Sequence, residues 1–163
     1  SNSTAYAYDE SGSNNNGPVT AKLQLPTTTQ WGNVSLTSTT RAITNETSGT
    51  TTSAGDLPTA FSYEGYAARL LTTQEVEQGC GFTVGSYTKG ELSSKCKYLM
   101  ENTKYSNSSL KTYGPWLETP SSSYSSNAWS VYGLSRYVNL DTVDSSISGV
   151  RPAIEVLKSD ISY

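Results

Sequence analysis

The sequence predicts an α+β protein with two short helices near the middle of the chain, followed by an antiparallel β-meander. Two observations carry this prediction. Helix-start and helix-face patterns lie between residues 67 and 102, and short segments with period-two alternation, separated by turn residues, follow Tyr105. A β-hairpin or an irregular segment is expected ahead of the helices. At 163 residues, the chain has room for one domain with its own core.

The first helix is expected to begin at Thr72, because Thr72 and Glu75 have the spacing of a capping box and Gly79 supplies a helix stop. A second helix is expected over residues 90–102. Apolar residues recur there at helical spacing and would form one buried face. These residues are Leu92, Cys96, Leu99 and Met100.

Four strands are expected after the helices, because β-branched and aromatic residues gather in short segments bounded by Ser, Gly, Asn or Asp. The segments are residues 115–120, 128–132, 136–140 and 150–157. Trp116 and Trp129 alternate with polar neighbours. Both tryptophans are therefore predicted to fill the core rather than to line a site.

The N-terminal third carries weaker patterns. Residues 1–18 form a polar Ser/Asn/Gly tract that ends in proline, which is typical of a flexible leader or linker. Residues 19–36 suggest two short strands around a turn at Pro26, and residues 37–59 suggest a long surface loop or an edge hairpin. A single domain is accordingly expected over residues 19–163.

Charge and composition exclude several classes of partner. The net charge is −3, and Lys and Arg form no runs, so nucleic acid is not an expected partner. No apolar stretch approaches the roughly 20 residues that span a bilayer, so direct membrane insertion is not expected. Twelve Tyr and three Trp supply apolar area in an otherwise polar chain. A mix rich in Ser, Thr, Asn and Gly favours an extracellular, cell-surface location.

Cys80 and Cys96 enclose a short loop. A disulfide that closes about 15 residues stabilises a fold by roughly 3 kcal/mol in the chain-entropy model. A Cys80–Cys96 disulfide is therefore the favoured interpretation, and a pair of buried thiols is the alternative. Zinc is not expected, because two cysteines without any histidine do not complete a tetrahedral site.

Several motifs in order resemble a known fold. RLLTTQEVE at residues 69–77 looks like the helix start of the formylglycine-generating-enzyme-like branch of C-type-lectin folds, and GVRPA at 149–153 looks like that branch's closing strand. YGPWLETP at 113–120 and NAWSVY at 127–132 are similar to segments of pilin-associated bacterial surface domains. Ligand-display domains diversified by retroelements are also similar. The resemblance is strongest over residues 60–160 and implies a C-type-lectin-like domain.

Catalysis and cofactors are not expected. The resembled oxidases use a cysteine pair late in the domain, and no cysteine follows Cys96. The calcium-binding motifs of sugar-binding C-type lectins are absent from the sequence, and without histidine neither a Ser-His-Asp nor a Cys-His arrangement can form. A carboxylate pair is the remaining enzymatic alternative. Its candidates are Glu75, Glu77, Glu118, Asp141 and Asp144.

Two other polar features have plain structural interpretations. Residues 139–144 offer oxygen ligands but lack the glycine and glutamate of an EF-hand loop, so a solvated turn is the favoured interpretation over a metal site. Arg69 and Arg151 are predicted to be structural. The resemblance places both near the base of the core, where a guanidinium bonds backbone carbonyls or pairs with a carboxylate such as Glu75 or Glu155.

Residues 121–148 are the predicted binding face, because Tyr supplies rigid contact area while Ser, Gly and Asn supply adaptable hydrogen bonds. The sequence thus predicts a non-enzymatic adhesion or binding domain for a glycan or a protein of a host or neighbouring cell. A structural subunit or spacer of a pilus-like filament is the alternative, and a phage receptor-binding domain is a further one. The alternative for residues 121–148 is that their Tyr, Ser, Gly and Asn side chains keep the protein soluble and bind no ligand. The predicted contact residues are Tyr124, Asn127, Tyr132, Arg136, Tyr137, Asn139 and Asp141.

Overall fold

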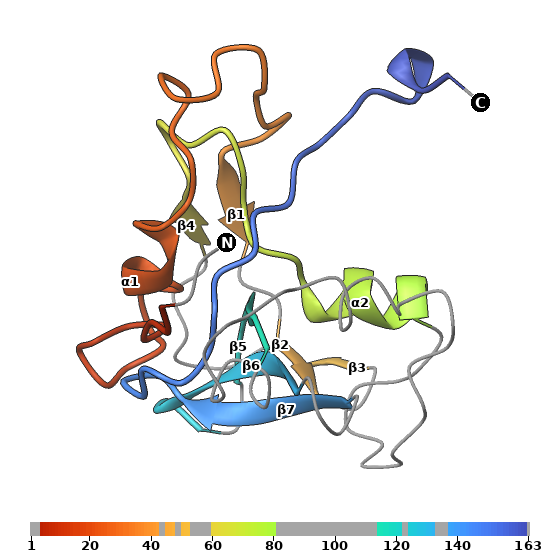
Figure 1. The fold of residues 1–163 in the computed structure, drawn as a ribbon. Helices are drawn as coiled ribbons and strands as arrows, with labels where there is room; N and C mark the ends of the chain where they lie inside the picture. The colour runs from red at the N-terminus through yellow and green to blue at the C-terminus, as the bar shows by residue number, and fades with distance from the viewer. Residues whose placement is uncertain are drawn as a thin grey trace.

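A computed structural model describes residues 4–42, 45–47, 50–52, 60–80, 114–121, 124–132 and 137–162. It is a small α+β protein with few helices and antiparallel sheets, as the sequence predicts (Figure 1). Within these residues, no helix is long and apolar enough to cross a membrane.

The main sheet has three strands: β5 (Trp116–Pro120), β6 (Asn127–Tyr132) and β7 (Tyr137–Thr142). They pair antiparallel in the order β5-β6-β7. These bounds confirm the three predicted strands to within one or two residues. The β6–β7 register runs from Asn127 opposite Thr142 to Tyr132 opposite Tyr137.

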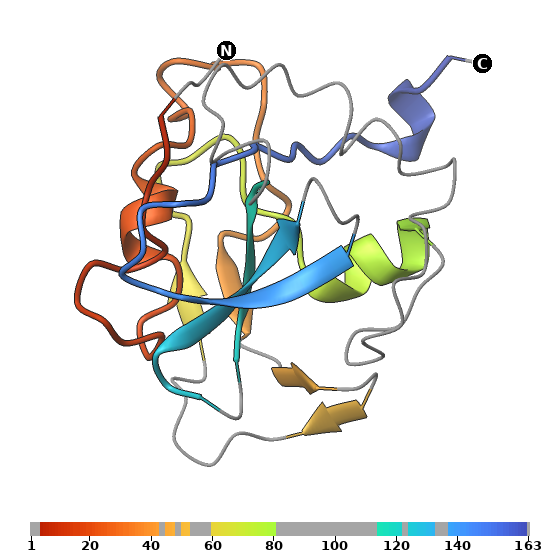
Figure 2. The same ribbon diagram turned by 60° about the horizontal axis from the view of Figure 1, so that its bottom comes forward.

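Both faces of this sheet pack against other parts of the protein. Side chains alternate between the two faces along each strand, so neighbouring residues join different clusters. Trp116 joins a core cluster with Tyr8, Leu70 and Ala128, whereas its neighbour Leu117 joins a second cluster. Helix α2 covers the second face (Figure 2). The core role predicted for the two sheet tryptophans is confirmed, since Trp116 is 1% exposed and Trp129 is 5% exposed. The second cluster contains Val76, Cys80, Leu117, Trp129 and Val131.

Helix α2 (Thr73–Cys80) begins as predicted. The Glu75 amide donates to Thr72 Oγ1 at 3.0 Å, and the Thr72 amide donates to Glu75 Oε2 at 2.9 Å, which confirms the capping box. The helix continues past the predicted stop to Cys80, whose side chain is buried. The second predicted helix, residues 90–102, lies outside the described residues, as does Cys96, so the Cys80–Cys96 disulfide stays a prediction.

The N-terminal segment differs from the predicted leader. Tyr8 and Asn14 are fully buried, and the amides of Tyr8 and Asp9 both donate to the carbonyl oxygen of Val143. The first predicted strand after Pro18 is instead helix α1 (Val19–Lys22). Tertiary contacts favour the helix over the predicted strand, because the amides of residues 20 and 21 both donate to the Tyr8 carbonyl, and Ala21 faces the core. The second predicted strand, after Pro26, is replaced by turns.

Short antiparallel pairs occupy the stretch predicted to be a loop or an edge hairpin. Strand β1 (Thr40–Ala42) pairs with β4 (Ala60–Ser62), and β2 (Asn45–Thr47) pairs with β3 (Thr50–Thr52). The β2–β3 pair agrees with the hairpin alternative.

The predicted strand over residues 150–157 is wrong. Only Ala153 pairs in this stretch, through a single bridge to Arg69. Pro152 has no amide hydrogen to donate to a ladder, so pairing does not propagate from this bridge toward the N-terminus. Beyond it the chain runs away from the sheets to a 3-10 helix, η2 (Lys158–Asp160), as Figure 1 shows.

Candidate functional site

The predicted contact residues that the structure describes are spread along the main sheet. Asn127 and Tyr132 stand at opposite ends of β6, about 17 Å apart at the rise of an extended strand. Tyr137 lies opposite Tyr132, at the far end of the sheet from Tyr124. Arg136 and the side chains of Tyr132 and Tyr137 lie outside the described part of the chain. Asn139 is half-buried.

Asp141, a predicted contact residue, does not lie on the exposed surface. Its side chain is buried, the residue being 8% exposed, and it accepts a hydrogen bond from the Ser130 hydroxyl. Burial raises the pKa of Asp141, and the Ser130 hydroxyl opposes that change. The β6–β7 pairing places both residues on the face that carries Ala128. In the described residues, Asp141 belongs to no cluster of three or more His, Cys, Asp or Glu side chains suited to a metal ion.

Tyr124 is the predicted residue that the structure displays best, since it is 61% exposed. The buried side chain of Asn14 fixes the turn that carries Tyr124. Asn14 Nδ2 donates to the carbonyl oxygens of Ser121, Tyr124 and Asn127 at 2.9, 3.0 and 2.7 Å. The sequence offers no local sign of these contacts, because Asn14 lies more than 100 residues from the turn. Asn127 thus takes part in holding the turn through its backbone.

Arg69 organises a group of charges beside α2. Its Nη1 donates to Glu75 Oε2 at 2.8 Å and to the Leu70 carbonyl at 3.0 Å, and its Nε donates to Glu155 Oε1 at 2.8 Å. The structural role predicted for Arg69, with both carboxylates as partners, is confirmed. The same residue forms the backbone bridge to Ala153, so it joins helix α2 to the C-terminal segment.

Arg41 and Glu118 form a second ion pair in the interior. Arg41 Nε donates to Glu118 Oε1 at 3.0 Å, and Glu118 is almost fully buried. Burial raises the pKa of Glu118, while Arg41 acts in the opposite direction. The hydroxyl of Tyr8 donates to the Glu118 carbonyl at 2.7 Å. This pair ties strand β1 to the main sheet, with the carboxylate of Glu118 buried and the side chain of Arg41 partly exposed.

Acid should destabilise the protein through Glu155. Burial by itself would raise the pKa of Glu155, but hydrogen bonds from Arg69 and from the Thr37 amide lower it to about 2. The folded-state pKa is below the ordinary value of 4.5, so the unfolded chain binds the proton first as pH falls. This contribution to stability is complete above about pH 5 and is lost between about pH 4.5 and 2.

Urea unfolding at several pH values across that range tests this expectation. The free energy of unfolding of the wild type should fall more steeply with acid than that of Glu155→Gln. Asp160→Asn is the matched control, because Asp160 is exposed and lies five residues further along the chain. Parallel curves for wild type and Glu155→Gln would contradict the assignment.

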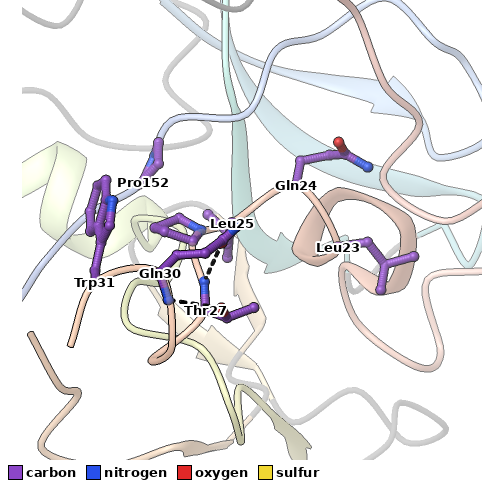
Figure 3. A pocket seen from close by; sticks show the side chains of 8 residues that line it. Leu23, Gln24, Leu25, Thr27, Gln30, Trp31 and Pro152 are labelled. Carbon is purple, nitrogen blue, oxygen red and sulfur yellow. Dashed lines mark hydrogen bonds between the residues drawn. The ribbon is translucent and has the colours of Figure 1, made fainter.

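An open groove of ≈ 590 Å³ lies along residues 23–31 and beside Pro152 (Figure 3). Trp31 and Pro152 lie at one end in this view, and Leu23 and Gln24 lie at the other. Trp31 is 42% exposed, in contrast to the two buried tryptophans. The described lining residues are Leu23, Gln24, Leu25, Pro26, Thr27, Gln30, Trp31 and Pro152, none of which is titratable.

Backbone hydrogen bonds fix the turn that carries Trp31. The amides of Gln30 and Trp31 both donate to the Thr27 carbonyl at 3.0 Å, and Gln30 Oε1 accepts the Thr27 amide at 2.9 Å. The turn is held to the rest of the fold by the Thr28 amide, which donates to Gly65. The sequence pattern of residues 19–36 predicts a strand at Trp31, whereas the structure has a turn there. A lone Trp among Thr, Gln, Gly and Asn was the available sign of an exposed ring.

The fold and the groove define a small α+β protein with a partly aromatic surface groove whose described lining carries no charged side chain. No family model, no curated protein and no solved structure matches this chain.

Proposed function

We propose that the chain is a non-enzymatic extracellular binding domain that holds a glycan or protein ligand, and that the ligand contacts the Trp31 groove. The exposure of Trp31 carries this proposal. Covering an indole ring removes a large apolar area from water, and Trp is one of the residue types enriched among those that dominate binding energy. The groove volume of ≈ 590 Å³ lies in the range of about 300–1,000 Å³ typical of ligand pockets.

The chemistry of the lining supports binding rather than catalysis. General acid–base catalysis needs a titratable side chain within hydrogen-bond reach of the substrate. The side chains of the eight described lining residues supply two amides, one hydroxyl, one indole N–H and otherwise apolar groups. The chain also has no histidine, the residue that most often performs proton transfer near neutral pH.

The C-type-lectin-like fold remains part of the proposal, and one contact supports it. The two motifs that resemble that fold, at residues 69–77 and 149–153, lie side by side through the backbone bridge between Arg69 and Ala153. Their amides donate reciprocally at 3.0 and 2.8 Å. A cell-surface location rests on the polar composition and on the predicted disulfide.

A glycan array combined with a mucin-binding screen tests the proposed function. Trp31→Ala should weaken any ligand found by about tenfold or more, because truncating an aromatic anchor removes its contact area. Tyr124→Ala is the matched control, since Tyr124 is also an exposed aromatic but lies on the turn held by Asn14. Binding that is lost in Tyr124→Ala and kept in Trp31→Ala would move the site to that turn. Absence of any ligand would count against the binding function.

A structural filament subunit is the second candidate, and one observation favours it. The C-terminal segment exposes four large apolar side chains, which subunit contacts would cover. Sedimentation at increasing protein concentration should then show assembly that Leu157→Ser weakens. A monomer at all concentrations would argue against this candidate. The exposed residues are Ile154, Val156, Leu157 and Ile161.

A further inference from the structure

We infer that the Trp31 groove takes a neutral saccharide, with the indole ring against the apolar face of a sugar and the amides of Gln24 and Gln30 bonded to its hydroxyls. This inference rests on the proposed binding function and names the ligand class for the same groove. Three properties of the lining lead to it: the absence of charge among the described lining residues, the placement of two amides, and the presence of a single exposed aromatic ring.

Charge selects a neutral ligand. None of the eight described lining residues is Asp, Glu, Lys or Arg. An ionised ligand that entered the groove would lose hydration and gain no opposite charge from these eight residues, which is unfavourable. Sialylated, sulfated and phosphorylated ligands, as well as strongly charged peptides, are therefore disfavoured.

The two amides suit hydroxyl groups. A glutamine side chain both donates and accepts hydrogen bonds, as a sugar hydroxyl does. Gln30 Oε1 already accepts the Thr27 amide at 2.9 Å, which holds this side chain in place and directs Nε2 to act as the donor. Gln24 is half-buried and lies on the other side of the groove from Trp31 in Figure 3. Gln30 lies between Trp31 and Gln24 in this view, so a ligand that extends from Trp31 to Gln24 passes both amides.

A single aromatic ring favours a saccharide over a proline-rich peptide. Domains that bind polyproline helices use grooves lined by several aromatic residues. In the described lining, Trp31 is accompanied instead by Leu23, Leu25 and two prolines. The hydrogen-bonded turn from Thr27 to Trp31 fixes the backbone that carries the ring, so little backbone freedom is lost when the ligand arrives.

Tryptophan fluorescence of the whole chain provides a direct test. All three tryptophans are described, and Trp116 and Trp129 are 1% and 5% exposed, so acrylamide quenching reports chiefly on Trp31. The probes are neutral trisaccharides of glucose, galactose and N-acetylglucosamine, an oligogalacturonate as the anionic counterpart, and a proline-rich decapeptide. We expect at least one neutral trisaccharide to protect Trp31 from quenching and the oligogalacturonate to give no protection.

Amide variants test the polar half of the inference. Gln24→Leu keeps the side-chain volume and removes the amide, and it should weaken trisaccharide binding by about three- to tenfold. Gln78→Leu on the exposed side of α2 is the matched control and should leave binding unchanged. Equal binding by wild type and Gln24→Leu would overturn the amide contact.

The possible failures are distinguishable. Protection of Trp31 by the peptide or by the oligogalacturonate, with none by the neutral trisaccharides, would overturn the ligand class and leave the binding function in place. No protection by any probe, together with no ligand on the array, would overturn both.

Discussion

Replacement of Arg69 by methionine is expected to lower the free energy of unfolding by about 3 kcal/mol, at the low end of the range for breaking a buried ion pair. The guanidinium is nearly buried and serves Glu75, Glu155 and the Leu70 carbonyl together. Methionine retains much of the aliphatic stem and donates no hydrogen bond. Both carboxylates are partly solvated, which moderates the loss.

Chemical denaturation followed by circular dichroism measures this effect. Arg69→Lys should lose less than Arg69→Met but more than a surface substitution, because lysine retains the charge without the planar fork that bonds two carboxylates. Lys158→Met is the matched control, since Lys158 is an exposed cation, and should change stability by less than about 0.5 kcal/mol. If Arg69→Met behaved like this control, the group of charges around Arg69 would have no role in stability.

Tyr8→Ala is expected to be at least as damaging, with a loss of about 3–5 kcal/mol. The ring is fully buried and meets Trp116 edge to face, with centroids 5.7 Å apart. Its hydroxyl donates to the Glu118 carbonyl. Truncation therefore removes a large apolar contact and leaves a cavity between the N-terminal segment and the main sheet.

Tyr8→Phe separates the contribution of the hydroxyl from that of the ring, and Tyr124→Ala is the control. Tyr8→Phe retains the ring and loses one hydrogen bond, so about 1 kcal/mol is expected. Tyr124→Ala removes an exposed tyrosine and should be nearly neutral. Thermal unfolding monitored by near-ultraviolet circular dichroism compares the three proteins. An unchanged midpoint in Tyr8→Ala would restore the interpretation of residues 1–18 as a leader.

Features of the fold that depend on neighbouring residues were predictable. The capping box at Thr72 needs only a hydroxyl and a carboxylate three residues apart. Strands β5 to β7 follow from alternation and intervening turn residues, because the two-residue period of a strand determines which side chains share a face.

Long-range contacts account for the failed predictions. Residues 1–18 are polar in composition, yet Asn14 is buried. Its side-chain amide donates to backbone carbonyl oxygens more than 100 residues away. Residues 150–157 carry strand-forming residues, but formation of a strand depends on a neighbour to pair with, and only Ala153 has one in the described structure. The prediction of the binding residues depends on composition, which does not distinguish the buried Asp141 from the exposed Tyr124.

The sequence by itself determined the α+β class, the capped helix and the three-stranded meander, since each of these depends on side chains a few residues apart. The tertiary structure decided the role of the N-terminal segment and the place of the groove. Trp31 and Pro152 come together there although 120 residues separate them. No local pattern encodes that proximity, because it results from packing of the whole core beneath both segments.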